Sequence, residues 1–408
     1  MSNRYRWYVV IVLTLAAALN YADRAVIAAL LPLMRSSLGM SDAMLGALSS
    51  FFMVAYALAS PATGLIADRL PRVRVIVWSL SVWSVATVLS GCAATAGQMF
   101  LTRILLGLSQ CAYLPAAVAL MADFHPAGRR AFAIGLPLAG CNLGVIVGGF
   151  LGGYSGDHFG WRPAFFFLGT FGLVLAAVCV VTLRPIAAAE RKPAPGQAAG
   201  APRARFRELF RVPSFLIILL ESSCLAASGW CFLAWLPFFF HEKYHLTLTG
   251  AALAGTVAYQ VSATLGYAIG GYGSDRFAAS RRERRMLLQS LCYLVGAPFL
   301  LVFATSAGVG VISGAIFVTS LCRALGSAND QVLICEVLPP SLRATAVGLM
   351  NGVNIGVGAA SVQLAALLLP HLPLAVMFAS MTGLFLAAAA VTQLGYRRYL
   401  RQDLIAGQ

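Results

Sequence analysis

Hydrophobic residues fill long runs of this chain, and short polar segments separate these runs. A run of about 18 or more apolar residues is long enough to cross a bilayer as a helix. The pattern therefore predicts an all-α membrane protein with twelve transmembrane helices in two pseudo-symmetric six-helix bundles. The expected spans cover residues 7–30, 43–66, 74–95, 98–121, 131–153, 161–183, 213–239, 248–273, 286–304, 308–334, 344–368 and 372–395.

A polar segment rich in Pro, Ala and Arg divides these spans six and six. This composition is typical of a linker. We therefore expect an N-terminal six-helix bundle at 1–183, a cytosolic linker at 184–212 and a C-terminal six-helix bundle at 213–408.

The two halves repeat each other at the ends of corresponding spans. Residues 64–69 (GLIADR) match residues 271–276 (GYGSDR), with an offset of 207. Residues 123–130 (DFHPAGRR) match residues 336–343 (EVLPPSLR), with an offset of 213. Two homologous six-span halves are typical of secondary transporters that move about a site near the bilayer midplane.

Charge is scarce and unevenly placed. Only 11% of residues are charged, yet the net charge is +15. Of the 29 Lys and Arg residues, 23 fall in segments that lie on one side of the membrane, and three (Arg35, Arg162 and Lys243) fall on the other. The positive-inside rule then predicts cytosolic termini. No basic stripe interleaved with aromatic residues occurs, so we do not expect nucleic acid as a partner.

Enzyme and cofactor motifs are missing from the sequence. The nine cysteines lie in or beside apolar runs without a CxxC pair, so they read as small buried hydrophobic residues. No GKS/T, HExxH or GxSxG motif occurs. We expect no enzyme activity, no cofactor and no metal. We also expect no cleavable signal peptide, since the first polar residues lead directly into a full-length span.

Asp23 and Arg24 lie in the middle of the first apolar run. A charge at bilayer depth costs about 2.5–3.5 kcal/mol on insertion scales and normally faces a partner or a water-filled cavity. We expect Arg24 to bind a substrate carboxylate through its planar guanidinium, and Asp23 to exchange a proton. Tyr21, one turn away, can offer a hydroxyl group. The simpler alternative is an ion pair that fixes helix packing.

Gln110 and Arg323 occupy corresponding positions in spans 4 and 10, because the offset of 213 relates them. If one lines a central cavity, the other does too. Arg24 and Arg323 would then hold an anion from the two halves. The alternative pairs Arg323 with Asp330, two helical turns further on.

Other polar residues within spans are weaker candidates. Arg103 could partner Asp23 or take part in coupling, and Glu221 could exchange a proton or serve a gate. Trp230 corresponds to Asp23 through the offset of 207 and could wall the substrate site. The amides Asn142, Asn351 and Asn354 could bind substrate or bridge helices.

Charged residues near the cytosolic span ends are expected to form a gate, since charges at helix termini can lock one conformation. The expected gate residues are Asp68, Arg69, Arg72, Asp123, Arg130, Asp275, Arg276, Glu336 and Arg343. Gly140, Gly144, Gly148 and Gly152 recur every four residues in span 5, and we expect this ridge to allow close helix packing.

The chain resembles the major facilitator superfamily over nearly its whole length. The GxxxDRxxR motif at residues 64–72, its echo after span 8 and the RxxxG motif at residues 103–107 carry the resemblance. The segment NYADR at residues 20–24 resembles two groups of that superfamily. One group moves organic anions with protons, and the other is the spinster-like group, linked to lysolipids and sphingoid lipids.

Residues elsewhere divide between the two groups. Asn351, Asn354 and the WLP triplet at residues 235–237 favour the anion group, whereas Tyr113 favours the spinster-like group. Both groups commonly carry a glutamate at the position that Gln110 occupies in this chain. A glutamine side chain cannot titrate.

The resemblance implies a monomeric transporter of a small organic anion by proton-coupled symport and alternating access, in contact with membrane lipid. A lysolipid transporter and a drug-type proton antiporter are the alternatives. The Ala-rich composition and short loops favour a bacterial inner membrane.

Overall fold

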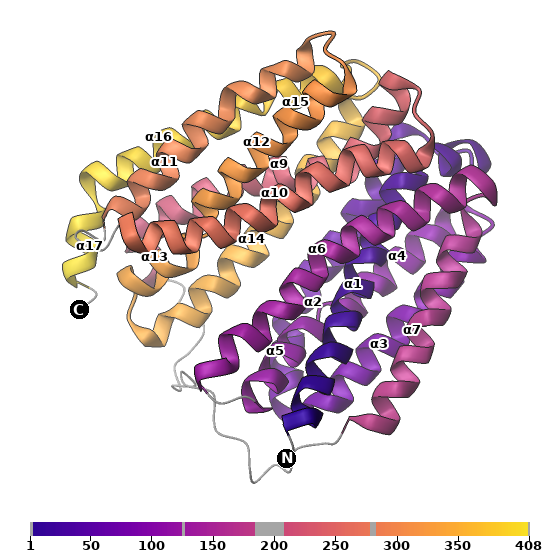
Figure 1. Cartoon of the computed structure of the whole chain (residues 1–408), viewed down its shortest axis with the longest axis horizontal. Helices are drawn as coiled ribbons and strands as arrows, with labels where there is room; N and C mark the ends of the chain where they lie inside the picture. The colour runs from indigo at the N-terminus through magenta and orange to yellow at the C-terminus, as the bar shows by residue number, and fades with distance from the viewer. Residues whose placement is uncertain (1–2, 125–126, 184–207, 278–282, 407–408) are drawn as a thin grey trace. The chain divides into compact units, whose positions relative to one another are not determined.

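The computed structural model describes residues 3–124, 127–183, 208–277 and 283–406, and every regular element among them is a helix. Most of the helices match the expected spans (Figure 1). They are α1 (Asn3–Ser37), α2 (Asp42–Arg69), α3 (Arg72–Gly91), α4 (Ala96–Gln110), α5 (Tyr113–Phe124), α6 (Ala127–His158), α7 (Arg162–Thr182), α9 (Pro213–Tyr244), α10 (Leu248–Phe277), α11 (Arg284–Gly296), the 3₁₀ helix η2 (Ala297–Ala304), α12 (Val309–Ser327), α13 (Asp330–Val337), α14 (Pro340–Leu368), α15 (Leu374–Ser380), α16 (Thr382–Arg398) and α17 (Leu400–Ala406).

Eleven helical segments of the described residues are long and apolar enough to cross a membrane. The expected eighth span, at 248–273, is helix α10, which has 30 residues and is not among the eleven. Its sequence is rich in Gly, Ala, Ser and Thr, so its length suits a span better than its hydropathy does. The twelve predicted spans thus all fall on helices.

Four predicted spans are each built from two helical pieces, and two of these breaks lie at corresponding positions of the repeat. Between α4 and α5, Pro115 lacks an N–H group and its ring crowds the carbonyl of Cys111. Between α12 and α13, the amide of Asn329 donates to the carbonyls of Leu325 and Gly326 and so competes with the helical ladder. Ala328 is the counterpart of Pro115 through the offset of 213. A proline in one half and a side-chain amide in the other therefore interrupt the two helices at corresponding positions of the repeat.

Contacts between residues divide the chain into two compact units. Unit 1 comprises residues 1–192, 233–257 and 362–370, and unit 2 comprises residues 193–232, 258–361 and 371–408. Helices α9, α10 and α14 are therefore shared between the units. The predicted bundles at 1–183 and 213–408 stay a prediction, and most of the predicted linker at 184–212 lies outside the described residues.

Within unit 1, α1 and α6 pack backbone against backbone (Figure 1). A Cβ atom added at any of the four ridge glycines would fall within 3.0 Å of a carbonyl oxygen of α1. The oxygens belong to successive turns of α1, so both helices run in the same direction. The pairs are Gly140 with Thr14, Gly144 with Ala18, Gly148 with Ala22 and Gly152 with Val26. The expectation that this ridge permits close packing is confirmed.

This contact leads to a stability prediction. Gly148→Ala should lower the thermal stability of the purified protein, because overpacking a tight site costs about 1–3 kcal/mol. Gly135→Ala on the same helix is the matched control, since an added Cβ meets nothing within 4 Å there. Alanine is also the better helix former by about 1 kcal/mol, so this control should match or exceed the wild type. Equal melting temperatures for both variants would contradict the packing account.

Candidate functional site

The polar residues of α1 lie beside the turn that Gly148 contacts, and Arg24 is the centre of the first cluster. Its Nε donates to Oε1 of Gln110 at 2.9 Å, and its Nη2 donates to Oδ1 of Asn20 at 2.8 Å. Gln110 also donates to the Asn20 carbonyl at 3.4 Å. Asn20 and Gln110 are buried, whereas Arg24 is half-buried.

Three aromatic rings surround the same guanidinium. Its carbon lies 4.6 Å from the ring centre of Tyr21 and 4.9 Å from those of Phe52 and Tyr56. Each such contact stabilises a cation by about 0.5–2 kcal/mol, depending on desolvation. Among the residues that the structure describes, no carboxylate forms an ion pair with Arg24. The guanidinium is thus held by neutral groups and keeps its positive charge.

Asp23 points away from this cluster, toward α3 and α4. It is 1% exposed, and neither carboxyl oxygen has a hydrogen-bond partner within the described structure. Arg103 and Thr87 are within electrostatic reach of it. Arg103 is itself buried, donates to Ser90 at 2.8 Å and lies 5.5 Å from the ring of Phe165. Asp23 therefore faces Arg103 without a hydrogen bond to it, and a change in the protonation of Asp23 would alter the charge balance between the two groups.

Unit 2 holds a second arginine in comparable surroundings. Arg323 lies 5.3 Å from the ring centre of Tyr259, and its buried Nε has no hydrogen-bond partner among the described residues. It lines a small cavity together with Tyr259, Phe232, Thr319 and Ser320. No described salt bridge joins Arg323 to Asp330. The carboxyl of Asp330 instead accepts a hydrogen bond from Gln289 at 2.6 Å.

The remaining predicted binding residues have mixed surroundings. Ser222 and Ser223 of α9 both donate to Asn354 of α14 at 3.3 Å, so this amide bridges two helices. Asn351 is exposed, while Trp230 and Asn142 are half-buried. Glu221 is 1% exposed and lies beside Asp330.

The predicted gate is described only in part. Glu336 pairs with Arg285 at 3.4 Å, Arg343 donates to the carbonyl of Leu338, and Arg276 lies over the ring of Tyr272. Arg72 is half-buried at the start of α3. The other five gate side chains, those of Asp68, Arg69, Asp123, Arg130 and Asp275, lie outside the described part of the structure.

Several residues of these clusters were not predicted. Phe52 and Tyr56 form two walls around Arg24, and Tyr259 forms one beside Arg323. A signal for them exists in the repeat, because the offset of 207 pairs Phe52 with Tyr259. Arg285, counted only as a topological charge, donates to Ser274 at 2.8 Å and to Asn329 at 3.3 Å.

Asp157 was also missed, although it joins two helices of unit 1. Its carboxyl accepts the backbone N–H groups of Leu248 and Thr249, at 2.8 and 2.9 Å, and the hydroxyl of Thr249 at 2.6 Å. A carboxylate that accepts the first N–H groups of a helix is a strong cap. The end of α6 thus caps the beginning of α10.

Comparison with known proteins supplies the family. A protein of Mycolicibacterium smegmatis named "MFS-type efflux pump" is 29% identical over 291 residues, which cover 70% of this chain and 66% of that protein. A protein of Escherichia coli named "Probable L-galactonate transporter" is 27% identical over 283 residues, which cover 67% of this chain and 62% of that protein. The chain thus matches less than two thirds of the length of either relative.

The fold also has a solved counterpart. The crystal structure of a bacterial homologue of the human lysosomal transporter Spinster, in an inward-facing and unoccupied conformation, superposes with a TM-score of 0.81 at 21% identity and covers 99% of both chains. This likeness concerns the fold alone. It confirms the predicted all-α fold class.

The sequence pattern of the Major Facilitator Superfamily matches residues 13–362. This stretch contains both arginine clusters and the glycine ridge. The chain belongs to the major facilitator superfamily, and its apolar helices are those of a multi-pass membrane protein.

Proposed function

We propose that this transporter carries a small organic anion, a carboxylate or sugar acid, by proton-coupled symport and alternating access. The observation that carries the proposal is the environment of Arg24. Two neutral amide oxygens and three aromatic rings hold its guanidinium, without a described carboxylate partner.

A half-buried cation without a counter-ion is costly, because desolvation of an ion is only repaid by an opposite charge in good geometry. An anionic substrate would supply that charge. The guanidinium offers parallel N–H groups that suit a carboxylate, and its Nη1 has no hydrogen bond within the described structure. The rings of Tyr21, Phe52 and Tyr56 would exclude water from the contact, and the Tyr21 hydroxyl could bind a sugar hydroxyl.

Arg323 supports the same assignment from unit 2. It too rests beside an aromatic ring, has an unpaired buried Nε and lines a cavity. We propose that both arginines contact the anion during the transport cycle, with Arg103, Gln110, Trp230, Asn142, Asn351 and Asn354 as further substrate contacts. Asn354 would exchange its two serine partners for substrate when it does so.

Proton coupling would use Asp23. Its two unpaired oxygens and its nearness to Arg103 mean that protonation would release Arg103 from electrostatic attraction. Such a change could alter how α1 and α4 pack, and so favour one conformation of the transporter. The gate residues named from the sequence would then respond at the cytosolic end.

The names of relatives support an anionic substrate in part, since one is named for L-galactonate and another for efflux. A drug-type exporter that prefers cations would be poorly served by two arginines that form no ion pair among the described residues. A lysolipid transporter, the spinster-like alternative, would use Arg24 to hold a headgroup phosphate. Both alternatives are outcomes of the experiments below.

The arrangement in the cell is also a proposal. The excess of Lys and Arg on one side favours cytosolic termini. We propose a monomer in a bacterial inner membrane, with lipid around the helices.

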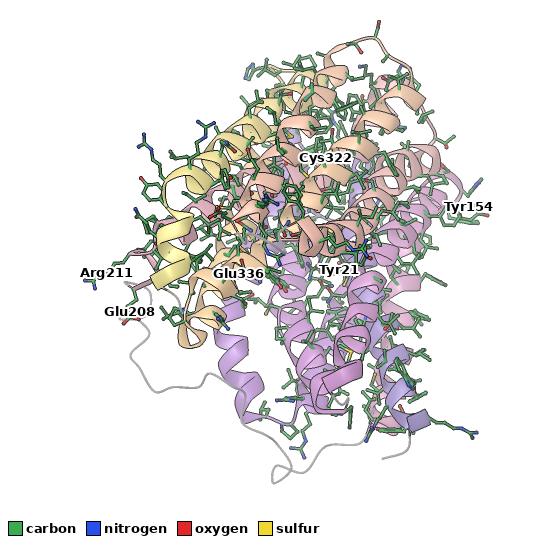
Figure 2. The ribbon with its side chains drawn as sticks, turned by 60° about the vertical axis from the view of Figure 1, so that its left-hand side comes forward. Tyr21, Tyr154, Glu208, Arg211, Cys322 and Glu336 are labelled. Atoms are coloured by element: carbon green, nitrogen blue, oxygen red, sulfur yellow. The ribbon has the colours of Figure 1, made fainter. Side chains whose placement is uncertain are left out.

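Arg24→Gln tests the anion site. The variant should lose affinity for sugar acids by about 30-fold or more, because removal of one partner of a buried charge pair costs about 2 kcal/mol or more. The measurement is counterflow of a labelled sugar acid in proteoliposomes. Arg211→Gln, at an exposed arginine that projects away from the helices, is the control and should transport normally (Figure 2). Normal counterflow by Arg24→Gln would sink the proposal.

Gln110→Glu tests the neutral partner of Arg24. An ionised glutamate there would form an ion pair with Arg24 and compete with the substrate carboxylate, so affinity near neutral pH should fall by about tenfold. Because the ion pair with Arg24 also keeps that glutamate ionised at mildly acidic pH, affinity should stay reduced from mildly acidic to neutral pH. Gln363→Glu, at a glutamine of α14 outside the cluster, is the control. Unchanged sugar-acid affinity of Gln110→Glu across this pH range would mean that Arg24 does not bind the anion.

A further inference from the structure

Two buried carboxyl groups lie side by side in unit 2. Glu221, in the first third of α9, is 1% exposed, and Asp330, the first residue of α13, is 7% exposed. The two groups are near enough to form a hydrogen bond with each other.

Polar groups that lack partners surround this pair. Gln289 of α11 donates to Asp330, but its own Oε1 accepts nothing. One turn further along α11, the hydroxyl of Tyr293 has no partner either. Both residues are 0% exposed. The Tyr293 ring packs directly on Gly326, where an added Cβ would fall within 3.0 Å of it, so the ring cannot move away easily.

These groups hold more unpaired acceptors than unpaired donors, because the Tyr293 hydroxyl near Glu221 is one donor and three acceptor atoms lack one. Both oxygens of Glu221 and the Oε1 of Gln289 are buried acceptors without a donor in the described structure. Each unsatisfied buried polar atom is costly, and two adjacent buried carboxylates do not both stay ionised. One proton on the pair would remove the second charge and supply the missing O–H donor. A carboxyl–carboxylate hydrogen bond would then replace two unpaired charges.

We propose that Glu221 and Asp330 share one proton and form a proton-binding site of this transporter in unit 2. This inference rests on the proposed proton-coupled function and assigns part of the coupling to a carboxyl pair rather than to a single acid. Glu221 holds the proton and donates it to Asp330. Asp330 is the ionised partner, because it accepts from Gln289 and begins a helix, where the dipole favours negative charge.

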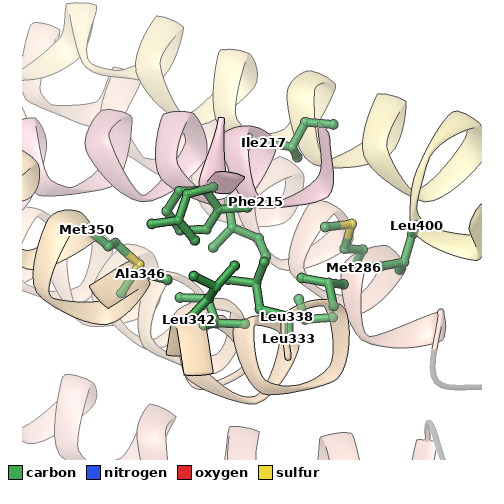
Figure 3. Close-up of a cluster of buried hydrophobic side chains, with 13 residues drawn as sticks. Phe215, Ile217, Met286, Leu333, Leu338, Leu342, Ala346, Met350 and Leu400 are labelled. Atoms are coloured by element: carbon green, nitrogen blue, oxygen red, sulfur yellow. The ribbon is translucent and has the colours of Figure 1, made fainter. Parts of the chain in front are cut away.

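A cluster of buried apolar side chains (Figure 3) includes residues that lie about one helical turn from the pair. Ile217 and Ile218 precede Glu221 by about one turn of α9, Leu333 and Ile334 follow Asp330 by one turn of α13, and Met286 precedes Gln289 on α11. All five side chains belong to that buried cluster. The cluster therefore covers one end of the pair with hydrocarbon and keeps water from that side.

The charged and titratable groups around the pair are few. Tyr293 of α11, Cys224 of α9 and Arg323 of α12 are within electrostatic reach. Further along the same helices lie the Arg285–Glu336 ion pair and Asp403, which accepts the N–H of Ser214 at the start of α9.

Arg323 links this proton site electrostatically to the proposed substrate site. With no anion bound, its positive charge favours the ionised form of Asp330. A substrate anion at Arg323 would neutralise that charge and so favour protonation of the pair. The proton comes from water and returns to water, and no other reactant is needed. Anion and proton would therefore bind together, as symport requires.

Infrared difference spectroscopy of the purified full-length protein tests the shared proton directly. Subtraction of the spectrum of Glu221→Gln from that of the wild type should leave the C=O stretching band of a protonated carboxylic acid. In Asp330→Asn this band should shift in frequency, because its hydrogen-bond partner changes. Glu242→Gln, at an exposed acid of the same helix, should leave no such band. A wild-type spectrum without a band that depends on Glu221 would overturn the inference.

Transport measurements in proteoliposomes test whether the carboxyl pair couples proton movement to uptake. Glu221→Gln and Asp330→Asn should both lose the uptake of sugar acid that a pH gradient drives, yet keep counterflow at the rate of Glu242→Gln. Gradient-driven uptake at the wild-type level in both variants would refute the coupling role. Wild-type protein stabilised by sodium chloride but not by choline chloride would also refute it, since the pair would then hold sodium.

The two levels of proposal can fail separately. If sugar acids show no counterflow in the wild type, the proposed function fails, while the infrared band still reports on the carboxyl pair. If counterflow and Arg24 dependence are present but the band is absent, only the carboxyl-pair inference fails.

Discussion

The contact between α1 and α6 is the constraint on which the site in unit 1 depends. Four glycines let the backbone of α6 lie directly against four carbonyl groups of α1, turn after turn. This leaves α1 little freedom to slide or rotate, because backbone atoms on both sides would collide. Arg24 therefore faces α2 and α4, and Asp23 faces α3 and α4. A single rigid contact thus separates two adjacent charges into two environments.

The charged groups of the protein follow a common logic. Arg24 is a cation held by aromatic rings and neutral amides, and Arg323 is a cation beside an aromatic ring, so each offers a charge that a ligand can satisfy. Asp23 and Glu221 are buried acids whose oxygens have no donor among the described residues, and Asp330 is a buried acid beside Glu221, so a proton would change the charge balance at each place. The replacement of a carboxylate by Gln110 beside Arg24 fits this division, because it leaves the cation uncompensated. Asp23, although adjacent to Arg24 in the chain, forms no ion pair with it among the described residues and faces Arg103 instead.

Much of the fold could be predicted from the sequence, because bilayer thickness fixes span length and hydropathy reveals it. The close packing at the glycine ridge could also be predicted, since helix packing explains a strict four-residue repeat of glycine. The helix breaks were harder. Pro115 could have marked one, but Asn329 breaks its helix through side-chain bonds that depend on tertiary structure.

The charged residues of the two clusters were named from the sequence, whereas the aromatic residues around them were not. Asp23, Arg24 and Arg323 stand out because charge is rare in a span, whereas Phe52, Tyr56 and Tyr259 look like ordinary apolar residues. Asp330 was considered only as a partner for Arg323. Its place beside Glu221 depends on how α13 packs against α9 and α11, which no local pattern reveals. Asp157 likewise acts on a helix about ninety residues away in the chain.

The most direct test of the central claim compares a sugar acid with its uncharged amide on the wild-type protein. The two ligands share shape and hydroxyl groups and differ only in the charge that the arginines would bind. A ligand that binds the folded state raises the melting temperature. The account predicts that the acid stabilises the protein and the amide does not. Stabilisation by lysolipid or by a cationic drug, with no stabilisation by sugar acids, would contradict it.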